Sequence, residues 1–358
     1  MALYSVIRGT GSYLPNRIVR NEDFLDSEFY ESTGAKFERP TEEIIKKFEQ
    51  ITGITERRYV GDDLVTSDIA YFAAMDALST SIIDRESLDY IIVAHNFGDV
   101  KAGNCRSDFV PSLSARVKEK LQIENPRTIP YDLPFGCPGW LQGVIQANCY
   151  LKSGLAKRVL VIGAETLSRI ADPHDRDSLL YADGAGAAII ESVTSDEPLG
   201  ILSHTVRSDT LKHAYMLRLG KSYNRNCVNG NLYLKMDGHK LYQYALRTVP
   251  AVVKESLERA HVTLGDVKKV FLHQANAKMD EAILARLFRL CGNTKVPPHI
   301  MPMTISWLGN SSVATVPTLF DLVVKGKVDN HGLEQGDVIV FASVGAGMNI
   351  NAVTYRMP

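Results

Sequence analysis

Short runs of β-branched and aliphatic residues alternate along the chain with longer segments whose apolar positions recur at helical spacing. The short runs predict buried strands, at residues 89–95, 158–165, 186–192, 268–274 and 337–344. The longer segments predict amphipathic helices, over residues 66–80, 138–153, 239–260, 277–290 and 312–325. Such alternation is typical of parallel sheets covered by helices, so the pattern predicts an α/β fold.

The second half of the chain repeats the order of elements in the first half. Each half has a helix, a strand such as DYIIVAH or KKVFLHQ, another helix, and an apolar strand that ends near a glycine. This architectural echo predicts an N-terminal half over residues 1–197 and a C-terminal half over residues 198–358. The charged segment 22–50 interrupts the first half, and we expect it to be a surface excursion.

Composition narrows the class of protein. The 358 residues are 45% hydrophobic and 23% charged, as in ordinary globular proteins. A balance of 40 basic and 41 acidic residues argues against nucleic acid as the main partner. No apolar run approaches the ~20 residues that a membrane span needs, and no secretion signal is recognisable. Five cysteines without paired or zinc-like spacing indicate a reducing compartment, so we expect a cytoplasmic protein with no metal site.

The first candidate for chemistry is Cys137, in the stretch DLPFGCPGWLQG. An extended segment precedes it, and Pro138 stands where a helix begins, a position that proline favours. A cysteine at a helix N-terminus faces unpaired N–H groups that stabilise a thiolate. The alternative is a thiol that only fills the core, which is how we interpret Cys105, Cys149, Cys227 and Cys291.

Two further polar residues stand at the ends of predicted elements. His273 ends a β-branched run, and Asn310 follows a glycine before a Ser-Ser pair suited to capping the next helix. Because ligands bind outside the carboxyl ends of parallel strands, Cys137, His273 and Asn310 can converge on one site. Alone, His273 could be a core histidine and Asn310 a turn residue. The remaining histidines carry no assignment.

The order of motifs carries a resemblance. GCPGWLQG, YLKSGLAKRVLVIGAE, DPHDR, YADGAGAAI, HQAN and GNSS follow one another as in the ketoacyl-ACP synthase III branch of the thiolase superfamily. The resemblance covers most of the chain from about residue 50. It implies a five-layered α-β-α-β-α fold of two related halves, a homodimer, and an acyltransferase that forms carbon–carbon bonds.

The resemblance also implies roles for single residues. Cys137 matches the acyl-accepting nucleophile, and His273 and Asn310 match the pair that acts on the second substrate. Gly345, Ala346 and Gly347 stand where the family has a glycine-rich loop that helps form the oxyanion hole. No cofactor is implied beyond the phosphopantetheine of acyl carrier protein or coenzyme A, which carries the substrate.

Further matches concern substrate delivery. Arg176 of DPHDR and Asn276 of HQAN match residues that contact the carrier or coenzyme A. Lys278, Arg286 and Arg289 stand where the family presents basic residues to acyl carrier protein, although they could be only a solvated helix face. Phe109 and Val110 align with the position from which the dimer partner closes the acyl tunnel in relatives.

Departures from the family indicate the substrate. Lys47 and Ile51 replace the tryptophan and arginine that hold the adenine of coenzyme A, which favours delivery by acyl carrier protein. Pro138 replaces the usual alanine after the nucleophile. Together with the charged segment 22–50, these features resemble the dialkylresorcinol (flexirubin-type) ketosynthases, which join a β-ketoacyl and an unsaturated acyl chain.

Four alternatives stay open at this point. The first is fatty-acid initiation from acyl-CoA and malonyl-ACP, and the second is a Cys-His-Asn thioester hydrolase. A degenerate thiolase-fold subunit is disfavoured because Cys137, His273 and Asn310 are all present. Hydroxymethylglutaryl-CoA synthase needs a glutamate base near the nucleophile, and no residue clearly matches one.

Overall fold

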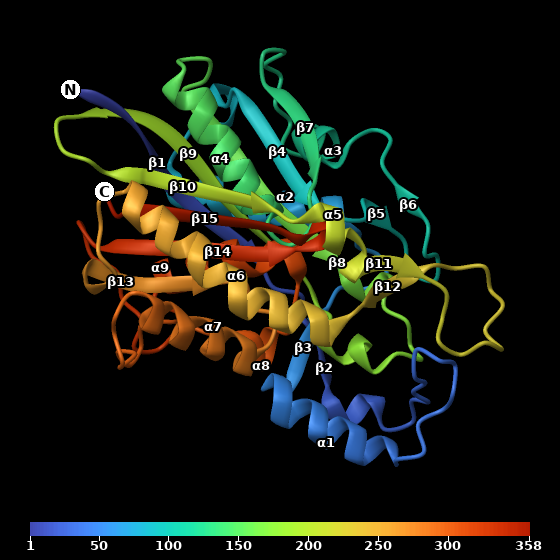
Figure 1. The fold of residues 1–358 in the computed structure, drawn as a ribbon. Helices are drawn as coiled ribbons and strands as arrows, with labels where there is room; N and C mark the ends of the chain where they lie inside the picture. Colours follow the sequence, from blue (N-terminus) through green and yellow to red (C-terminus); the bar gives the residue numbers. More distant parts are fainter.

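Two β-sheets form the centre of the molecule, with helices on their outer faces and between them (Figure 1). The computed structural model describes residues 1–358. The first sheet has the strand order β1-β9-β8-β4-β7, and the second has the order β10-β15-β14-β13. The first comprises β1 (Ala2–Tyr13), β4 (Tyr90–His95), β7 (Ile129–Pro134), β8 (Arg158–Thr166) and β9 (Asp183–Ser195). The second comprises β10 (Gly200–Ser208), β13 (Val267–Leu272), β14 (Val338–Gly345) and β15 (Asn349–Arg356). The chain therefore passes from one sheet to the other between Ser195 and Gly200.

Three buried clusters define the layers. The first packs α2 (Thr66–Ser81) and α3 (Leu113–Lys120) against the outer face of the first sheet. The second joins both sheets through α4 (Gly139–Lys152) and α9 (Thr315–Val324), which lie between them. The third packs α6 (Gly238–Arg259) and α7 (Ala277–Leu290) on the outer face of the second sheet. The five layers expected for a thiolase-like fold are confirmed.

The sheets are mixed rather than parallel, which corrects the expectation from the sequence. β4 runs parallel to β7 and β8, and β13 runs parallel to β14. The other neighbouring pairs are antiparallel. The connection of β14 to β15 shows the reason, because a turn of three residues is too short for the crossover that parallel strands require.

The predicted helices agree with the structure to within a few residues at each end. One difference is functional: the helix expected over residues 312–325 begins as a 3-10 turn at Ser312–Ala314 and becomes α-helical only at Thr315. The strand β1 was not predicted. Gly9 and Gly11 interrupt its apolar pattern because α2 crosses it so closely that a Cβ at Gly11 would lie 2.3 Å from the Ala73 carbonyl oxygen.

The charged segment forms a surface excursion beside the second half of the chain, as Figure 1 shows for α1 (Thr41–Thr52). A β-hairpin from the second half, β11 (Leu217–Gly220) and β12 (Tyr233–Met236), lies near it. The remaining small elements are β2 (Arg17–Arg20), β3 (Glu56–Tyr59), β5 (Asp99–Val100), β6 (Ser107–Asp108), α5 (Thr210–His213) and α8 (Ile305–Leu308). None of the helices is long and apolar enough to cross a membrane.

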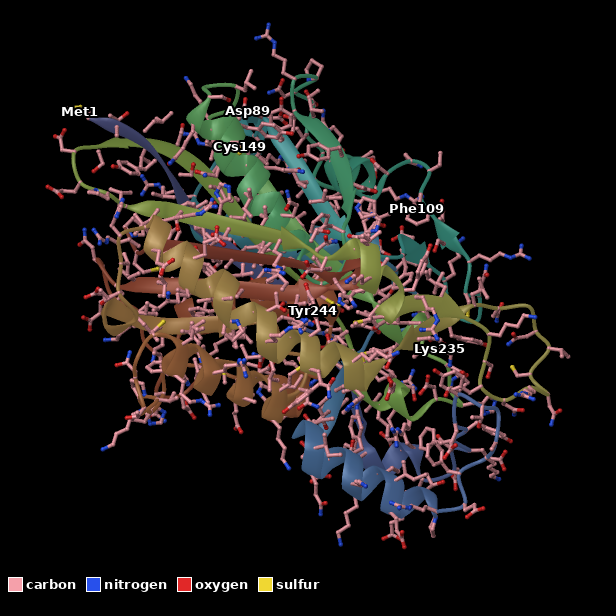
Figure 2. The ribbon with its side chains drawn as sticks, in the orientation of Figure 1. Met1, Asp89, Phe109, Cys149, Lys235 and Tyr244 are labelled. Carbon is pink, nitrogen blue, oxygen red and sulfur yellow. The ribbon has the colours of Figure 1, made fainter.

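Buried charges fix the hairpin to the segment before β9. Lys235 on β12, labelled in Figure 2, is 2% exposed, and its Nζ contacts Asp172 and Asp175 at 2.5 and 3.0 Å. The ammonium also lies 3.5 Å from the ring centroid of Tyr223. Since breaking one partner of such a pair leaves a buried charge, this contact holds the hairpin and the Arg176 segment together.

Candidate active site

The nucleophile candidate Cys137 lies immediately before the helix between the two sheets. Pro138 is the N-cap residue and α4 begins at Gly139, one residue later than expected. The amide N–H of Cys137 donates to no backbone carbonyl, so it is free for a ligand. Its sulfur accepts a hydrogen bond from the Ser312 hydroxyl at 3.2 Å.

The thiol of Cys137 is protonated at neutral pH. Burial raises the pKa of Cys137 to about 11, the Ser312 hydrogen bond opposes the rise, and the nearby Glu165 carboxyl adds to it. The expected stabilisation of a thiolate at the helix N-terminus is therefore outweighed by desolvation. The proton must leave the sulfur as the thiol attacks, and Cys137 shares the cavity with the imidazole of His273.

His273 lies directly after β13, with its N–H bonded to the Ala342 carbonyl of β14 at 2.9 Å. Burial lowers the pKa of His273 to about 4, so the imidazole is neutral at physiological pH. Its Nδ1 lies 2.6 Å from the Thr315 hydroxyl, which donates to the Ser312 carbonyl at 3.1 Å. Because a hydroxyl carries one hydrogen, Nδ1 is the donor in its bond to Thr315. The Nε2 atom is then an acceptor.

Asn310 is fixed from both halves of the chain. Its backbone N–H donates to the Leu180 carbonyl at 2.9 Å, and its own carbonyl accepts from Ala182 at 2.9 Å. Its Oδ1 accepts the backbone N–H of Ser312 at 2.8 Å. The side-chain carbonyl is therefore occupied, while the Nδ2 donor has no protein partner. Asn310 can donate to a ligand in the cavity.

The glycine-rich loop lies against the nucleophile. A Cβ built on Gly345 would lie 2.7 Å from the Cys137 nitrogen and 2.6 Å from Cδ of Pro138. Gly136 has φ 80° and also packs closely on Ala346, where a Cβ built on it would lie 3.0 Å from the Ala346 nitrogen. Glycine is required at both positions because the two backbones touch. This contact brings the Cys137 amide beside the 345–347 loop, as an oxyanion hole needs.

One cavity of about 960 Å³ brings together most of the residues selected from the sequence. Cys137, His273 and Asn310 line it together with Ala346. Arg176 and Asn276 line it as well, and the Asn276 side chain also caps α7. Lys47 and Ile51 on α1 belong to the same wall.

Other predicted residues lie outside this cavity. Lys278, Arg286 and Arg289 are exposed on α7. Phe109 (45% exposed, labelled in Figure 2) and Val110 (84% exposed) lie on a loop at the edge of the molecule and do not line the cavity within one chain. Their role in a partner's tunnel stays a prediction.

Sequence reasoning missed four residues at the site. Asn96 and Ser312 line the cavity, and Glu165 lies behind them. Asp177 also lines the cavity, where burial and the neighbouring Asp175 raise its pKa to about 7. The resemblance of GNSS pointed to the Ser312 segment, but no local pattern pointed to Asn96 or Glu165. The Glu165 carboxyl is close enough to raise the pKa of Cys137, yet it does not line the cavity.

A cysteine, a neutral histidine and an amide donor line one cavity, beside a glycine-rich backbone loop, and this combination can form and use a thioester on cysteine. Two matches identify the family. Residues 131–210 match 3-oxoacyl-[acyl-carrier-protein] synthase III, and residues 257–357 match the C-terminal part of the same family. The chain belongs to this family of condensing acyltransferases.

Two similar proteins match the chain over nearly its whole length. The chain is 31% identical over 353 residues to the β-ketoacyl-ACP synthase III of Staphylococcus saprophyticus, covering 98% of each chain. It is 31% identical over 354 residues to that of Erythrobacter litoralis, covering 98% of this chain and 99% of the other. Among solved structures, the priming β-ketosynthase of the R1128 polyketide pathway superposes with a TM-score of 0.80 at 27% identity, covering 99% of this chain and 96% of the other.

Proposed function

We propose that this condensing enzyme loads an acyl group from acyl carrier protein onto Cys137 and joins it to a second acyl thioester. The finer proposal is that a β-ketoacyl chain and an unsaturated acyl chain are joined, as in dialkylresorcinol biosynthesis. The observation that carries it is the cavity of about 960 Å³, which combines the three reactive side chains with apolar side chains of α1. Ile44, Phe48 and Ile51 supply that apolar surface.

In the first half-reaction the Cys137 sulfur attacks the carbonyl carbon of the incoming thioester. The free N–H of Cys137 and an N–H of the 345–347 loop hydrogen-bond the oxyanion, a contribution of about 3 kcal/mol per donor in comparable sites. The carrier thiol leaves with a proton, and the acyl group remains on the enzyme. One thioester replaces another, so the step is nearly neutral in free energy.

In the second half-reaction a carbanion must form at the α-carbon of the other thioester. A neutral imidazole with an acceptor at Nε2 can remove a proton, but a base whose pKa is about 4 needs an acidic carbon. The α-carbon of a β-ketoacyl thioester lies between two carbonyls and is acidic in this sense. Asn310 Nδ2 can donate to the thioester oxygen on which negative charge develops. The carbanion then attacks the acyl carbon, and Cys137 leaves as the thiol.

Delivery by acyl carrier protein is supported by two residues of the cavity wall. Ile51 offers no guanidinium to an adenine ring. Arg176 lines the cavity over the ring of Phe37 at 5.3 Å and could hydrogen-bond a phosphate of the carrier arm there. The exposed basic residues Lys278 and Arg286 suit the acidic surface of a carrier protein.

We also propose a homodimer. Strand β7 is an edge of the first sheet, and Ile129 at its start is 47% exposed. Exposed strand edges and apolar side chains are commonly covered in native proteins. The loop that carries Phe109 and Val110 lies on the same side of the chain as β7 (Figure 2). Light scattering would return twice the 39.6 kDa of one chain if the proposal holds, and the mass of one chain would contradict it.

The experiment for the finer proposal is product analysis with paired donors. The enzyme is offered β-ketoacyl-ACP with enoyl-ACP, and separately acetyl-CoA with malonyl-ACP, and products are identified by mass. Condensation of the first pair without loss of carbon dioxide supports the proposal. Acetoacetyl-ACP from the second pair alone would assign fatty-acid initiation instead, and free acid without any condensed product would assign a hydrolase.

A further inference from the structure

We propose that Asn96 and Glu165 are positioning residues for the nucleophile: they hold the Ser312 hydroxyl as a hydrogen-bond donor to Cys137 Sγ. The inference rests on Cys137 being the acyl acceptor and does not depend on which second substrate is used. It gives a role to Glu165, a buried carboxyl that the half-reactions above do not use.

Four side chains from separate parts of the sequence form one continuous hydrogen-bonded row. The backbone N–H of Asn96 donates to Glu165 Oε2 at 2.8 Å, and its side-chain Nδ2 donates to the same oxygen. Asn96 Nδ2 also contacts Ser312 Oγ at 3.0 Å. The row ends where Ser312 Oγ meets Cys137 Sγ at 3.2 Å.

The direction of every hydrogen bond in the row is fixed from the carboxylate end. Above pH 7 Glu165 is ionised and can only accept, so the amide of Asn96 must turn its NH₂ group toward Glu165. The second hydrogen of that NH₂ group then points at Ser312, whose oxygen must accept it. Because the Ser312 hydroxyl has only one hydrogen, that hydrogen is left for Cys137. The last bond therefore donates to sulfur, which stabilises a thiolate as it forms.

The fold explains why these residues meet. Asn96 directly follows β4, and Glu165 is the penultimate residue of β8, its parallel neighbour. The carboxyl ends of these two strands therefore face the cavity together. Ser312 has φ 52°, which is uncommon for a residue other than glycine, and it is held there by its bonds to Asn310 and Thr315. Such over-determined backbone is typical of functional sites.

Burying the Glu165 carboxyl is also energetically unfavourable. It is 1% exposed, and its Oε1 has no hydrogen-bond partner. The titratable groups around it act in opposite directions, because His95 on β4 favours the carboxylate while Asp183 on β9 disfavours it. The titratable groups around Cys137 are Glu165, Tyr181 and, in the shared cavity, His273. An unpartnered carboxyl oxygen beside a nucleophile indicates a role beyond packing.

The test is the pH profile of Cys137 alkylation by iodoacetamide, read from the mass of the peptide that contains Cys137 so that the other cysteines do not interfere. Ser312→Ala removes the donor, and we expect alkylation at pH 8 to fall about tenfold or more with a profile displaced to higher pH. Asn96→Ala frees Ser312 to rotate and shifts the profile in the same direction. Asn21→Ala, which removes another buried asparagine bonded to a glutamate, is the matched control and leaves the profile unchanged.

Glu165 is tested by a pair of substitutions that both remove its charge. Glu165→Gln keeps an acceptor oxygen for Asn96, whereas Glu165→Leu removes it. We expect the leucine variant to be alkylated about tenfold more slowly than the glutamine variant. Adding Asn96→Ala to Ser312→Ala should have no further effect, because Asn96 acts through Ser312. Equal rates for the two Glu165 variants, or profiles unmoved by Asn96→Ala and Ser312→Ala in folded protein, would overturn the proposal.

Discussion

The substitution Glu165→Gln should make the enzyme more stable at alkaline pH while leaving its stability at acidic pH nearly unchanged. Burial is the main cause that raises the pKa of Glu165 from 4.5 to about 7. The folded protein therefore binds more protons than the unfolded chain between pH 4.5 and 7. By linkage, the free energy of unfolding of the wild type falls as the pH rises through this window, whereas that of Glu165→Gln does not.

The magnitude follows from the two pKa values. Their difference corresponds to about 3 kcal/mol of stability, fully lost above pH 7 and regained below pH 4.5. Glutamine keeps an oxygen for the two Asn96 donors and carries no charge, so it avoids the loss. For a chain of 358 residues, the Tm of Glu165→Gln minus the Tm of the wild type should therefore be about 4 °C larger at pH 8 than at pH 4.5.

Thermal unfolding of both proteins across this pH range, at one protein concentration, provides the assay. Asp183→Asn is the matched contrast, since burial raises the pKa of Asp183 to about 6. Its two oxygens accept from Val60 and from both the amide and the hydroxyl of Ser168. An amide there turns NH₂ toward a donor, so this variant should be destabilised at every pH. If the difference in Tm between Glu165→Gln and the wild type is the same at every pH, Glu165 does not have a raised pKa in the folded protein.

Three other predictions concern the cavity. Thr315→Val removes the acceptor for His273 Nδ1, so nitrogen NMR should show a change of tautomer, and condensation should slow about tenfold. An unchanged tautomer would contradict the assignment. Gly345→Ala inserts a Cβ 2.7 Å from the Cys137 backbone nitrogen and should lower the rate of acyl loading more than 100-fold. Gly332→Ala, which has open space around it, should leave that rate unchanged. Equal rates for the two variants would refute the oxyanion role. Ile51→Arg supplies a guanidinium at the cavity wall and should lower KM for acyl-CoA severalfold without changing KM for acyl-ACP. Equal changes in the two KM values would show that residue 51 does not discriminate between coenzyme A and acyl carrier protein.

The sequence predicts those parts of the molecule that depend on neighbouring residues. The start of α4 and the position of Cys137 beside it follow from proline and helical spacing over residues 137–152. His273 and Asn310 could be selected because each stands at the end of an element and inside a motif. The family resemblance then joined all three, and the cavity brings them together.

The parts that could not be predicted depend on contacts between distant segments. Glu165 and Asn96 are 69 residues apart in sequence and meet only because β4 and β8 are neighbouring strands. The residues around Glu165, GAET at 163–166, do not distinguish it from any other carboxylate at the end of a strand. The low pKa of His273 and the high pKa of Cys137 likewise come from burial, which the residues flanking them do not determine.

If Cys137 carries the acyl chain, intact-mass spectrometry after mixing with acyl-ACP will detect the acyl-enzyme itself. Wild-type protein and Cys137→Ala are each offered medium-chain and long-chain acyl-ACP, followed by protease digestion to locate the adduct. We expect one acyl group per chain, on the peptide containing Cys137, and no adduct in the alanine variant. An adduct that persists in Cys137→Ala, or a wild type that gains no mass from any acyl donor, would show that Cys137 is not the acyl acceptor.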